Sequence, residues 1–263
     1  MSESSYIFKS TEDSSEQHRL QLLEKIHDPN TLKLIDQAGA LRGKTCLEVG
    51  AGAGSIVRAL AKRVGPEGEV WALDMDTRFL KGLTDSNIQV IQGDIREIEL
   101  PGESFYLVHA RYVLSHIPEI EQVLAKFYDL LESGGVLILE EHDHTVSSPL
   151  GEESPDDQAV RRVMEAILKN FEPRGVDPAI GRTLPDYLQK FSWENLIWTM
   201  ESHQVRGGSD IAQLMGLSIG ELREQLVATG VASNEDVDAY VKLSRDETKE
   251  AIFYATGRIL AKK

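Results

Sequence analysis

Short apolar runs alternate with helical patterns at close intervals over residues 42–145. Each apolar run predicts a strand, and the stretches between the runs carry apolar residues at helical spacing. This alternation is typical of βαβ units, which build a parallel sheet covered by helices. The five predicted strands are 44–49, 69–73, 88–91, 105–110 and 135–139. The sequence therefore predicts an α/β fold for this part of the chain.

Helical patterns precede this core. Apolar residues fall at helical spacing over 16–28 and again over 31–40. The Asp28-Pro29-Asn30 sequence predicts a break between two helices, because proline disfavours helical backbone at the residue before it and asparagine can cap the next helix.

After residue 149 the pattern becomes mostly helical. Two further strands are predicted at 196–200 and 251–255, with helical stretches at 210–228 and 234–246 between them. These stretches are too long for an ordinary loop and predict an inserted cap. The sequence is thus divided into three parts. They are an N-terminal helical segment (1–40), a cofactor-binding core (41–150) and a C-terminal part of the sheet (151–263). The C-terminal part includes a helical substrate cap at about 207–248.

A glycine-rich loop follows the first predicted strand. Gly50, Gly52 and Gly54 lie between that strand and a predicted helix at 55–64. Glycine allows positive φ and a close approach of a ligand, and the helix N-terminus behind the loop favours negative charge. The dinucleotide-binding fingerprint would place its third glycine at position 55, which is Ser55. Glu48 at the strand end suits a ligand with an ammonium group better than a pyrophosphate.

Two further acids end the next strands. Asp74 comes twenty positions after Gly54, where a carboxylate can accept hydrogen bonds from both ribose hydroxyls of a nucleoside; NAD would fit this spacing equally well. Asp76, followed by Thr77, is the better candidate for a helix cap. Asp94 ends the third strand, where it can meet an adenine amino group.

Composition excludes several classes of function. Lys and Arg number 28 against 43 Asp and Glu, giving a net charge of −15, and such a surface disfavours nucleic acid and anionic lipid. No apolar run approaches the roughly 20 residues of a membrane span, and the polar, acidic N-terminus lacks the features of a signal peptide. The single cysteine, Cys46, excludes an internal disulfide framework. We expect a cytoplasmic protein, and a homodimer is compatible with the sequence.

These motifs resemble those of a known family. Leu47–Gly54 resembles motif I of the class I S-adenosylmethionine-dependent methyltransferases, and the other family-like segments are 73–80, 93–95, 105–118 and 175–182. The chain is similar to a bacterial small-molecule methyltransferase group within that family. Tyr106 stands where the family usually has Asp, and the two histidines in Glu141-His-Asp-His144 are unusual.

The resemblance implies a Rossmann-like seven-stranded mixed sheet of order 3-2-1-4-5-7-6, with helices on both faces and a helical cap insertion. It implies S-adenosylmethionine as cofactor and in-line methyl transfer to O, N or C of a small molecule, of the kind found in natural-product or secondary metabolism. The cofactor-binding residues it implies are Glu48, Gly50, Ala51, Gly52, Asp74, Met75, Asp94, Ile95 and Arg111. For Arg111, a surface salt bridge is an alternative.

Candidate catalytic residues follow strands four and five, at the edge where open α/β sheets bind ligands. They are Tyr112, His116, Glu141 and His142. His116 is a candidate general base, since an ordinary imidazole titrates near neutral pH; packing at a helix start is its alternative. His109 lies within a strand and is better explained as a hydrogen-bonded sheet residue. No third ligand accompanies His142 and His144, so we expect no metal.

Three other functions stay open. A cofactor-binding protein could use the sulfonium charge for a cyclisation or rearrangement without transferring a methyl group. A nicotinamide-dependent oxidoreductase is disfavoured by the glycine spacing. A regulatory protein with a vestigial site is disfavoured by the intact acids Glu48, Asp74 and Asp94.

Overall fold

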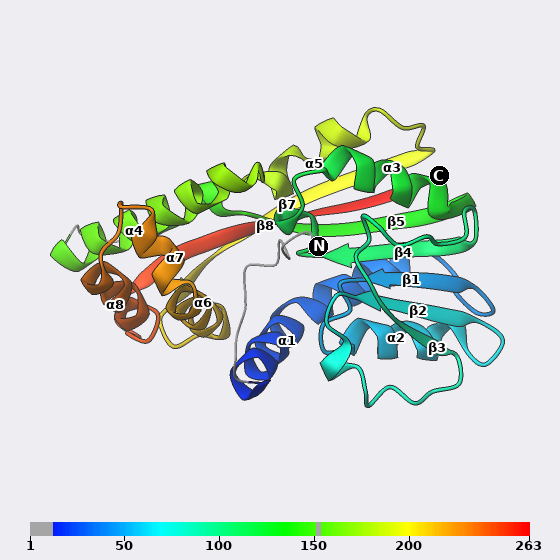
Figure 1. The fold of residues 1–263 in the computed structure, drawn as a ribbon, viewed down its shortest axis with the longest axis horizontal. Helices are drawn as coiled ribbons and strands as arrows, with labels where there is room; N and C mark the ends of the chain where they lie inside the picture. Colours follow the sequence, from blue (N-terminus) through cyan, green and yellow to red (C-terminus); the bar gives the residue numbers. More distant parts are fainter. Residues whose placement is uncertain (1–12, 151–153) are drawn as a thin grey trace.

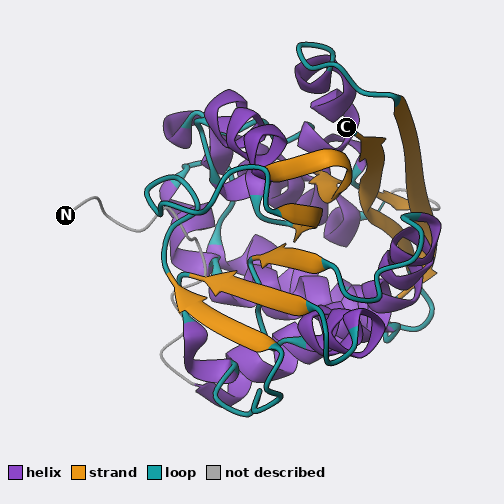
Figure 2. Cartoon of the chain, turned by 90° about the vertical axis from the view of Figure 1, so that its right-hand side faces the viewer, coloured by secondary structure: helices purple, strands orange, loops and turns teal. Residues whose placement is uncertain are grey.

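The described residues build an eight-stranded mixed sheet with helices on both faces (Figures 1 and 2). The structure is a computed structural model and describes residues 13–150 and 154–263. The strands are β1 (Thr45–Val49), β2 (Glu69–Asp74), β3 (Ile88–Gln92), β4 (Phe105–Arg111), β5 (Leu131–Asp143), β6 (Ser148–Leu150), β7 (Asn195–Arg206) and β8 (Glu250–Lys262). Strands β1 to β5 pair in parallel, and β8 runs antiparallel to them.

The predicted strand order is confirmed. The sheet runs β3-β2-β1-β4-β5-β8, and β7 pairs along the other edge of β8. Since β7 and β8 are the sixth and seventh predicted strands, this is the order 3-2-1-4-5-7-6. The short β6, which pairs with the first residues of β8, was not predicted.

The described residues form α-helices and short 3₁₀ turns. The helices are α1 (Asp13–Gln37), α2 (Ser55–Val64), α3 (Ile120–Leu130), α4 (Pro155–Phe171), α5 (Ile180–Leu188), α6 (Asp210–Glu221), α7 (Arg223–Ala228) and α8 (Asn234–Leu243), and the 3₁₀ turns are η1 (Thr77–Phe79), η2 (Leu114–His116), η3 (His144–Val146) and η4 (Glu172–Arg174). Helices α3 and α5 bury their apolar faces against one side of the sheet, whereas α2 and the end of α1 cover the other. None of the described helices has the length and apolarity to cross a bilayer.

The cap helices form a separate apolar cluster. Helices α4, α6, α7 and α8 gather at one end of the molecule, around the beginning of β8 (Figure 1). Tyr240, Phe253 and Val160 are buried at its centre. Ser154 and Ser233 each begin a helix with a capping box, which satisfies the first backbone N–H groups of α4 and α8. The cap is therefore packed as a unit on the extended end of the sheet.

The predicted break at Pro29 is wrong. Helix α1 continues through this residue to Gln37, although the first twelve residues of the predicted 1–40 segment lie outside the described residues. Neighbouring side chains explain the continuity, because Asp28 bonds Arg111 at 2.9 Å and Thr31 donates to Glu140. Tertiary contacts on both sides of the proline thus outweigh its local preference.

Two glycines allow α5 to lie directly on the sheet. Gly257 in β8 faces Gly181 in α5, and a Cβ built on Gly257 would overlap the carbonyl oxygen of Gly181. A Cβ on Gly181 would in turn overlap the carbonyl oxygen of Glu141. Both backbones are held in place by regular hydrogen bonding, so neither can move away cheaply.

Gly257→Ala should therefore lower the free energy of unfolding by about 2 kcal/mol or more, the scale of an overpacked core. Urea denaturation of the two proteins measures the difference. Gly82→Ala is the matched control, since a Cβ there has open space, and its free energy should change by less than about 0.5 kcal/mol. Equal stability of the Gly257→Ala variant and the wild type would show that α5 is not held at this contact.

Candidate cofactor and acceptor site

The glycine loop has the backbone geometry that glycine is needed for. Gly50, Gly52 and Gly54 have φ angles of 73°, 55° and 83°, which other residues rarely adopt. A Cβ on Gly50 would overlap a methyl group of Val113. At these three positions the loop carries no side chain of its own, which suits the cradle that a nucleoside-type cofactor requires.

Asp74 fastens this loop from the neighbouring strand. Its carboxylate accepts hydrogen bonds from the backbone N–H groups of Gly52 and Asp76, both at 2.8 Å. Burial raises the pKa of Asp74 above its ordinary value. Asp76 accepts from the N–H of Arg78 and begins η1, as predicted for the capping residue. Asp74 thus aligns the loop and still has lone pairs for a ligand hydroxyl.

Asp94 forms an ion pair that the sequence did not reveal. Arg96 approaches its carboxylate through two nitrogens, with Nη2 2.5 Å from Oδ2. The hydrogen bond from Arg96 lowers the pKa of Asp94. Ile95 beside it is buried, whereas Met75 across the site is 42% exposed. Asp94 is therefore a carboxylate paired with Arg96 that lines the cavity.

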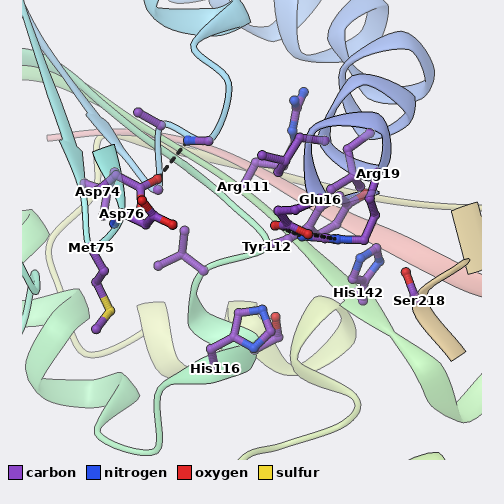
Figure 3. Close-up of a pocket in the computed structure, with 18 of the residues that line it drawn as sticks. Glu16, Arg19, Asp74, Met75, Asp76, Arg111, Tyr112, His116, His142 and Ser218 are labelled. Atoms are coloured by element: carbon purple, nitrogen blue, oxygen red, sulfur yellow. Dashed lines mark hydrogen bonds and ion pairs between the residues drawn. The ribbon is translucent and has the colours of Figure 1, made fainter. Parts of the chain in front are cut away.

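One cavity of about 650 Å³ connects these residues to the cap. Its first half is lined by the glycine loop, Asp74, Met75, Asp94 and Ile95. Its second half is lined by Tyr112, His116, His142 and His144 and by residues of α4, α6 and α7. In Figure 3, Asp74 and Met75 lie at one end, and His142 and Ser218 at the other. The structure thus brings all the predicted site residues except Glu141 to one space.

A chain of buried charges lies behind the loop. His109 Nδ1 lies 2.6 Å from Glu48 Oε2, and its Nε2 lies 3.5 Å from Glu140. Burial alone would lower the pKa of His109, but the attraction of Glu48 and Glu140 raises it to about 9. His109 is thus a charged, hydrogen-bonded residue of the sheet, and Glu48, which also lines the cavity, is partly neutralised by it.

Arg111 is part of the same buried network. Its guanidinium donates to Asp28 at 2.9 Å and to Thr31 at 2.7 Å. The alternative of a surface salt bridge is wrong, because only 11% of the Arg111 side chain is exposed. Arg111 lines the cavity, yet its charge is directed to α1 and holds that helix on the sheet.

Tyr112 is held in a strained backbone conformation. Its φ of 57° is uncommon for a residue with a side chain. The hydroxyl lies 3.0 Å from His27 and 2.9 Å from Thr256, and the ring stacks on that of His142 at 3.5 Å. Burial raises the pKa of Tyr112 well above its ordinary value. The hydroxyl is therefore protonated, and the aromatic face is what Tyr112 offers to its surroundings.

Glu141, a predicted catalytic residue, does not line the cavity. The strand β5 continues to Asp143 and turns the Glu141 side chain away from His142. Its carboxylate accepts the backbone N–H groups of Val113, Leu114 and Ser115 at 2.7–3.2 Å. Glu141 therefore fixes the start of η2 and leaves no carboxylate for the acceptor.

The three histidines of the cavity are neutral. Burial lowers the pKa of His116 to about 3 and of His144 to about 4, and places that of His142 well below its ordinary value. An imidazole with such a pKa is a weak base at neutral pH, and the general-base role of His116 stays a prediction. Among the described residues, no three His, Cys, Asp or Glu side chains converge as metal ligands.

Sequence reasoning missed the contribution of α1. Glu16 and Arg19 form a buried two-point ion pair with distances of 2.7 and 2.8 Å, and both line the cavity. Glu24 accepts the N–H of Ser55 at 3.1 Å and so caps α2 from a different helix. The cavity-lining residues of α1, at positions 16, 19, 20, 23 and 24, fall at helical spacing, but nothing in the sequence showed which face of α1 meets the loop.

Comparisons with known proteins agree with this arrangement. Residues 47–139 match the family model of a methyltransferase domain. Methyltransferase str2 of Strobilurus tenacellus is 30% identical over 150 residues, covering 56% of this chain and 52% of the relative. The ubiquinone/menaquinone biosynthesis C-methyltransferase UbiE of Bordetella parapertussis is 32% identical over 122 residues, covering 44% and 47%. The chain spans about half the length of the curated relatives it matches.

Solved structures share the fold. Phosphoethanolamine N-methyltransferase 2 of Haemonchus contortus, solved with S-adenosylhomocysteine, superimposes with a TM-score of 0.55 at 16% identity, over 89% of this chain and 52% of that one. The YcgJ protein of Bacillus subtilis gives 0.53 at 17% identity, over 94% and 98%. Residues 47–139 form a class I methyltransferase domain. Its cofactor is S-adenosylmethionine.

The stability of the methyltransferase domain should fall in alkaline solution. The pKa of His109 is about 9 in the folded protein and about 6.5 in an unfolded chain. The protonated form is thus favoured by folding, so its stabilisation is complete below pH 6.5 and is lost as the pH rises through 9. The free energy of unfolding should decrease by about 2–3 kcal/mol over this range.

His109→Asn supplies the comparison, because it fills similar space without titrating. Urea denaturation at pH 6.5, 8 and 9.5 should give a falling free energy for the wild type, and for the variant a lower free energy that changes less over this range. Parallel pH profiles of the two proteins would contradict a protonated His109.

Proposed function

We propose that this chain transfers the methyl group of S-adenosylmethionine to a small, largely apolar acceptor. The observation that carries the proposal is the single cavity that joins the glycine loop and its acids to an apolar chamber under the cap. Cofactor and acceptor would then lie end to end in one continuous space, which is the geometry of an in-line displacement.

The cofactor half offers a partner for each polar part of a nucleoside. Asp74 faces the loop that it holds through Gly52, so its remaining lone pairs are placed to accept ribose hydroxyls. Ile95 and Met75 supply apolar walls, and Asp94 also lines the cavity. The bare glycine backbone leaves room beside Glu48, whose acid at the strand end suits the ammonium group of the cofactor.

The acceptor half is predominantly apolar. The apolar residues that line it from the cap are Ile167, Phe171, Leu214, Met215, Ile219, Leu222 and Leu226, beside the two polar residues Asn170 and Ser218. The cation and anion that reach it from α1, Arg19 and Glu16, are paired with each other. Burying apolar surface of the acceptor would therefore supply its affinity, at roughly 25 cal/mol per Å². We infer an acceptor of natural-product or secondary-metabolite type.

The bound sulfonium supplies a methyl group that is intrinsically ready for displacement. The residues of this chain then have to align the acceptor and exclude water. The cap helices and α1 enclose the chamber, and Tyr112 is held by His27 and Thr256 as a fixed aromatic wall. UbiE is by name a C-methyltransferase of quinone biosynthesis, and its match favours an apolar acceptor over a nucleic acid, as does the −15 charge.

Asp74→Ala should weaken binding of S-adenosylhomocysteine at least about 10-fold. Two hydrogen bonds from ribose would be lost, each worth roughly 1.5–3 kcal/mol to a charged acceptor. Isothermal calorimetry measures the affinity, and Asp85→Ala, which changes an exposed aspartate outside the cavity, should bind like the wild type.

Methyl transfer itself is tested by incubating the protein with S-adenosylmethionine and aromatic or enolic hydroxyl compounds. We expect S-adenosylhomocysteine and a methylated product in equal amounts. Conversion of an added compound without release of S-adenosylhomocysteine would instead indicate a reaction that only uses the cofactor charge, and tighter binding of NAD would refute the cofactor assignment.

A further inference from the structure

Two histidine rings are fixed side by side in the wall of the acceptor chamber. His142 near the end of β5 and His144 at the start of η3 both line the cavity, and their ring centroids are 5.0 Å apart. His142 stacks on Tyr112 with an interplanar angle of 7°, and His144 stacks on Phe171 with one of 26°. Packing against these aromatic rings sets the direction of each imidazole.

Each ring has one nitrogen that a ligand can reach. The Nδ1 atoms of His142 and His144 are sealed from solvent and have no hydrogen-bond partner. Within the described part of the chain, neither imidazole forms any side-chain hydrogen bond. Since both side chains are only half-buried, their exposed edge is the one that carries Nε2. A bound molecule can therefore pair with Nε2 and not with Nδ1.

The position of the proton follows from the same geometry. A neutral imidazole carries one N–H donor and one bare acceptor nitrogen. An unpaired N–H sealed in the protein is rarer and more costly than an unpaired acceptor. The lower-energy tautomer therefore leaves Nδ1 bare and places the proton on Nε2 of both rings. Their burial, which lowers the pKa of His144 to about 4, keeps both rings neutral.

We propose that His142 and His144 direct two Nε2–H donors into the chamber and select an acceptor molecule that presents a carbonyl or phenolate oxygen on an apolar frame. This inference rests on the proposed function and names the class of its second substrate. A single such oxygen has lone pairs for both donors. The apolar frame would pack against Phe171, Met215 and Ile219, which line the same chamber.

The surrounding charges disfavour an ammonium acceptor. The Glu141 carboxylate is occupied by three backbone N–H groups. The Glu16 carboxylate is held by Arg19, whose charge also contributes to the lowered pKa of His142. A cationic amine in the chamber would lose its hydration and meet two N–H donors without a compensating anion.

The first experiment reads the tautomers directly. Two-bond ¹H–¹⁵N spectra of the uniformly ¹⁵N-labelled protein distinguish Nε2–H from Nδ1–H imidazoles, and His142→Phe and His144→Phe assign the two signals. We expect neutral Nε2–H forms for both rings at pH 7. An Nδ1–H form, or a charged ring, at either position would overturn the proposal.

The second experiment measures selection with three probes that share a two-ring frame. Calorimetry is performed on the protein saturated with S-adenosylhomocysteine. The probes are α-tetralone with a carbonyl oxygen, 1-naphthol with a hydroxyl, and 1-naphthylmethylamine, which is a cation at pH 7. We expect the tetralone and the naphthol to bind, and the amine to bind at least 10-fold more weakly. An amine that binds as well as the tetralone, or a tetralone that does not bind, would refute the selection.

Variants then connect the selection to the two rings. His142→Phe and His144→Phe keep the aromatic stacking and remove one donor each, so each should weaken tetralone binding roughly 2- to 10-fold. His142→Gln, whose amide N–H can replace Nε2–H, should recover part of the affinity. His203→Phe is the matched control, because His203 is exposed on β7 and lies outside the cavity. Unchanged tetralone binding in both ring variants would contradict the proposal.

Failure of this inference is distinguishable from failure of the proposed function. Binding of S-adenosylhomocysteine is measured first for every protein. If the wild type does not bind it, the methyltransferase proposal fails. If it binds equally to wild type and variants while the probes show no dependence on the rings, only the proposed acceptor class fails.

Discussion

The buried ion chain from Glu48 through His109 to Glu140 is the constraint on which the site depends. It crosses the three central strands β1, β4 and β5, and from Glu140 it continues to Arg258 of β8 at 2.8 Å. Burial alone would raise the pKa of Glu140, but His109 and Arg111 lower it to about 2. Removing one member would leave an uncompensated buried charge, which is far more costly than a surface ion pair. The strand ends that carry the site are thereby fixed relative to one another.

The same chain explains why α1 covers the cofactor half of the cavity. Thr31 donates to Glu140, and Arg111 bonds both Thr31 and Asp28. The middle of α1 is therefore anchored to the sheet by charge, and its preceding turns are carried over the glycine loop. One consequence is that Glu24 of α1 reaches the N-terminus of α2, where it accepts the N–H of Ser55. Helix α1, which was predicted to belong to a separate N-terminal segment, is therefore part of the site.

Alternation along β5 divides the other half of the site. Glu140 and His142 lie on one face of the strand, towards Thr31 and Tyr112, and Glu141 and Asp143 lie on the opposite face. Strand periodicity thus assigns Glu141 to the support of η2 and leaves His142 in the chamber. Two adjacent residues that looked equally suited to catalysis have different tasks because the strand continues four residues beyond Leu139, where its apolar run ends.

Local patterns and long-range contacts differ in what a sequence can reveal. The glycine loop, the acids at 74 and 94 and the strand order follow from short-range signals, namely strand–helix alternation and motif spacing. The path of α1 through Pro29, the Asp94–Arg96 pair and the low pKa of His116 depend on which distant surfaces meet. The tendency of Pro29 to break the helix was outweighed by contacts of Asp28 and Thr31 with residues some eighty or more positions away. Such contacts have no signature in one sequence.

The distribution of charge also bears on the chemistry that the chamber favours. The ionic side chains that α1 brings to the chamber, Glu16 and Arg19, compensate each other, and the histidines of the chamber are neutral. A sulfonium cation reacting with an oxygen or enolate anion consumes both charges, so the transition state is less polar than the reactants. An apolar, water-excluding space disfavours the separated ions more than this transition state, whereas two fixed N–H donors can hold the anion in line without quenching it. The wall of neutral donors and apolar side chains is thus suited to a nucleophile that arrives ionised, and it provides no strong base for one that does not.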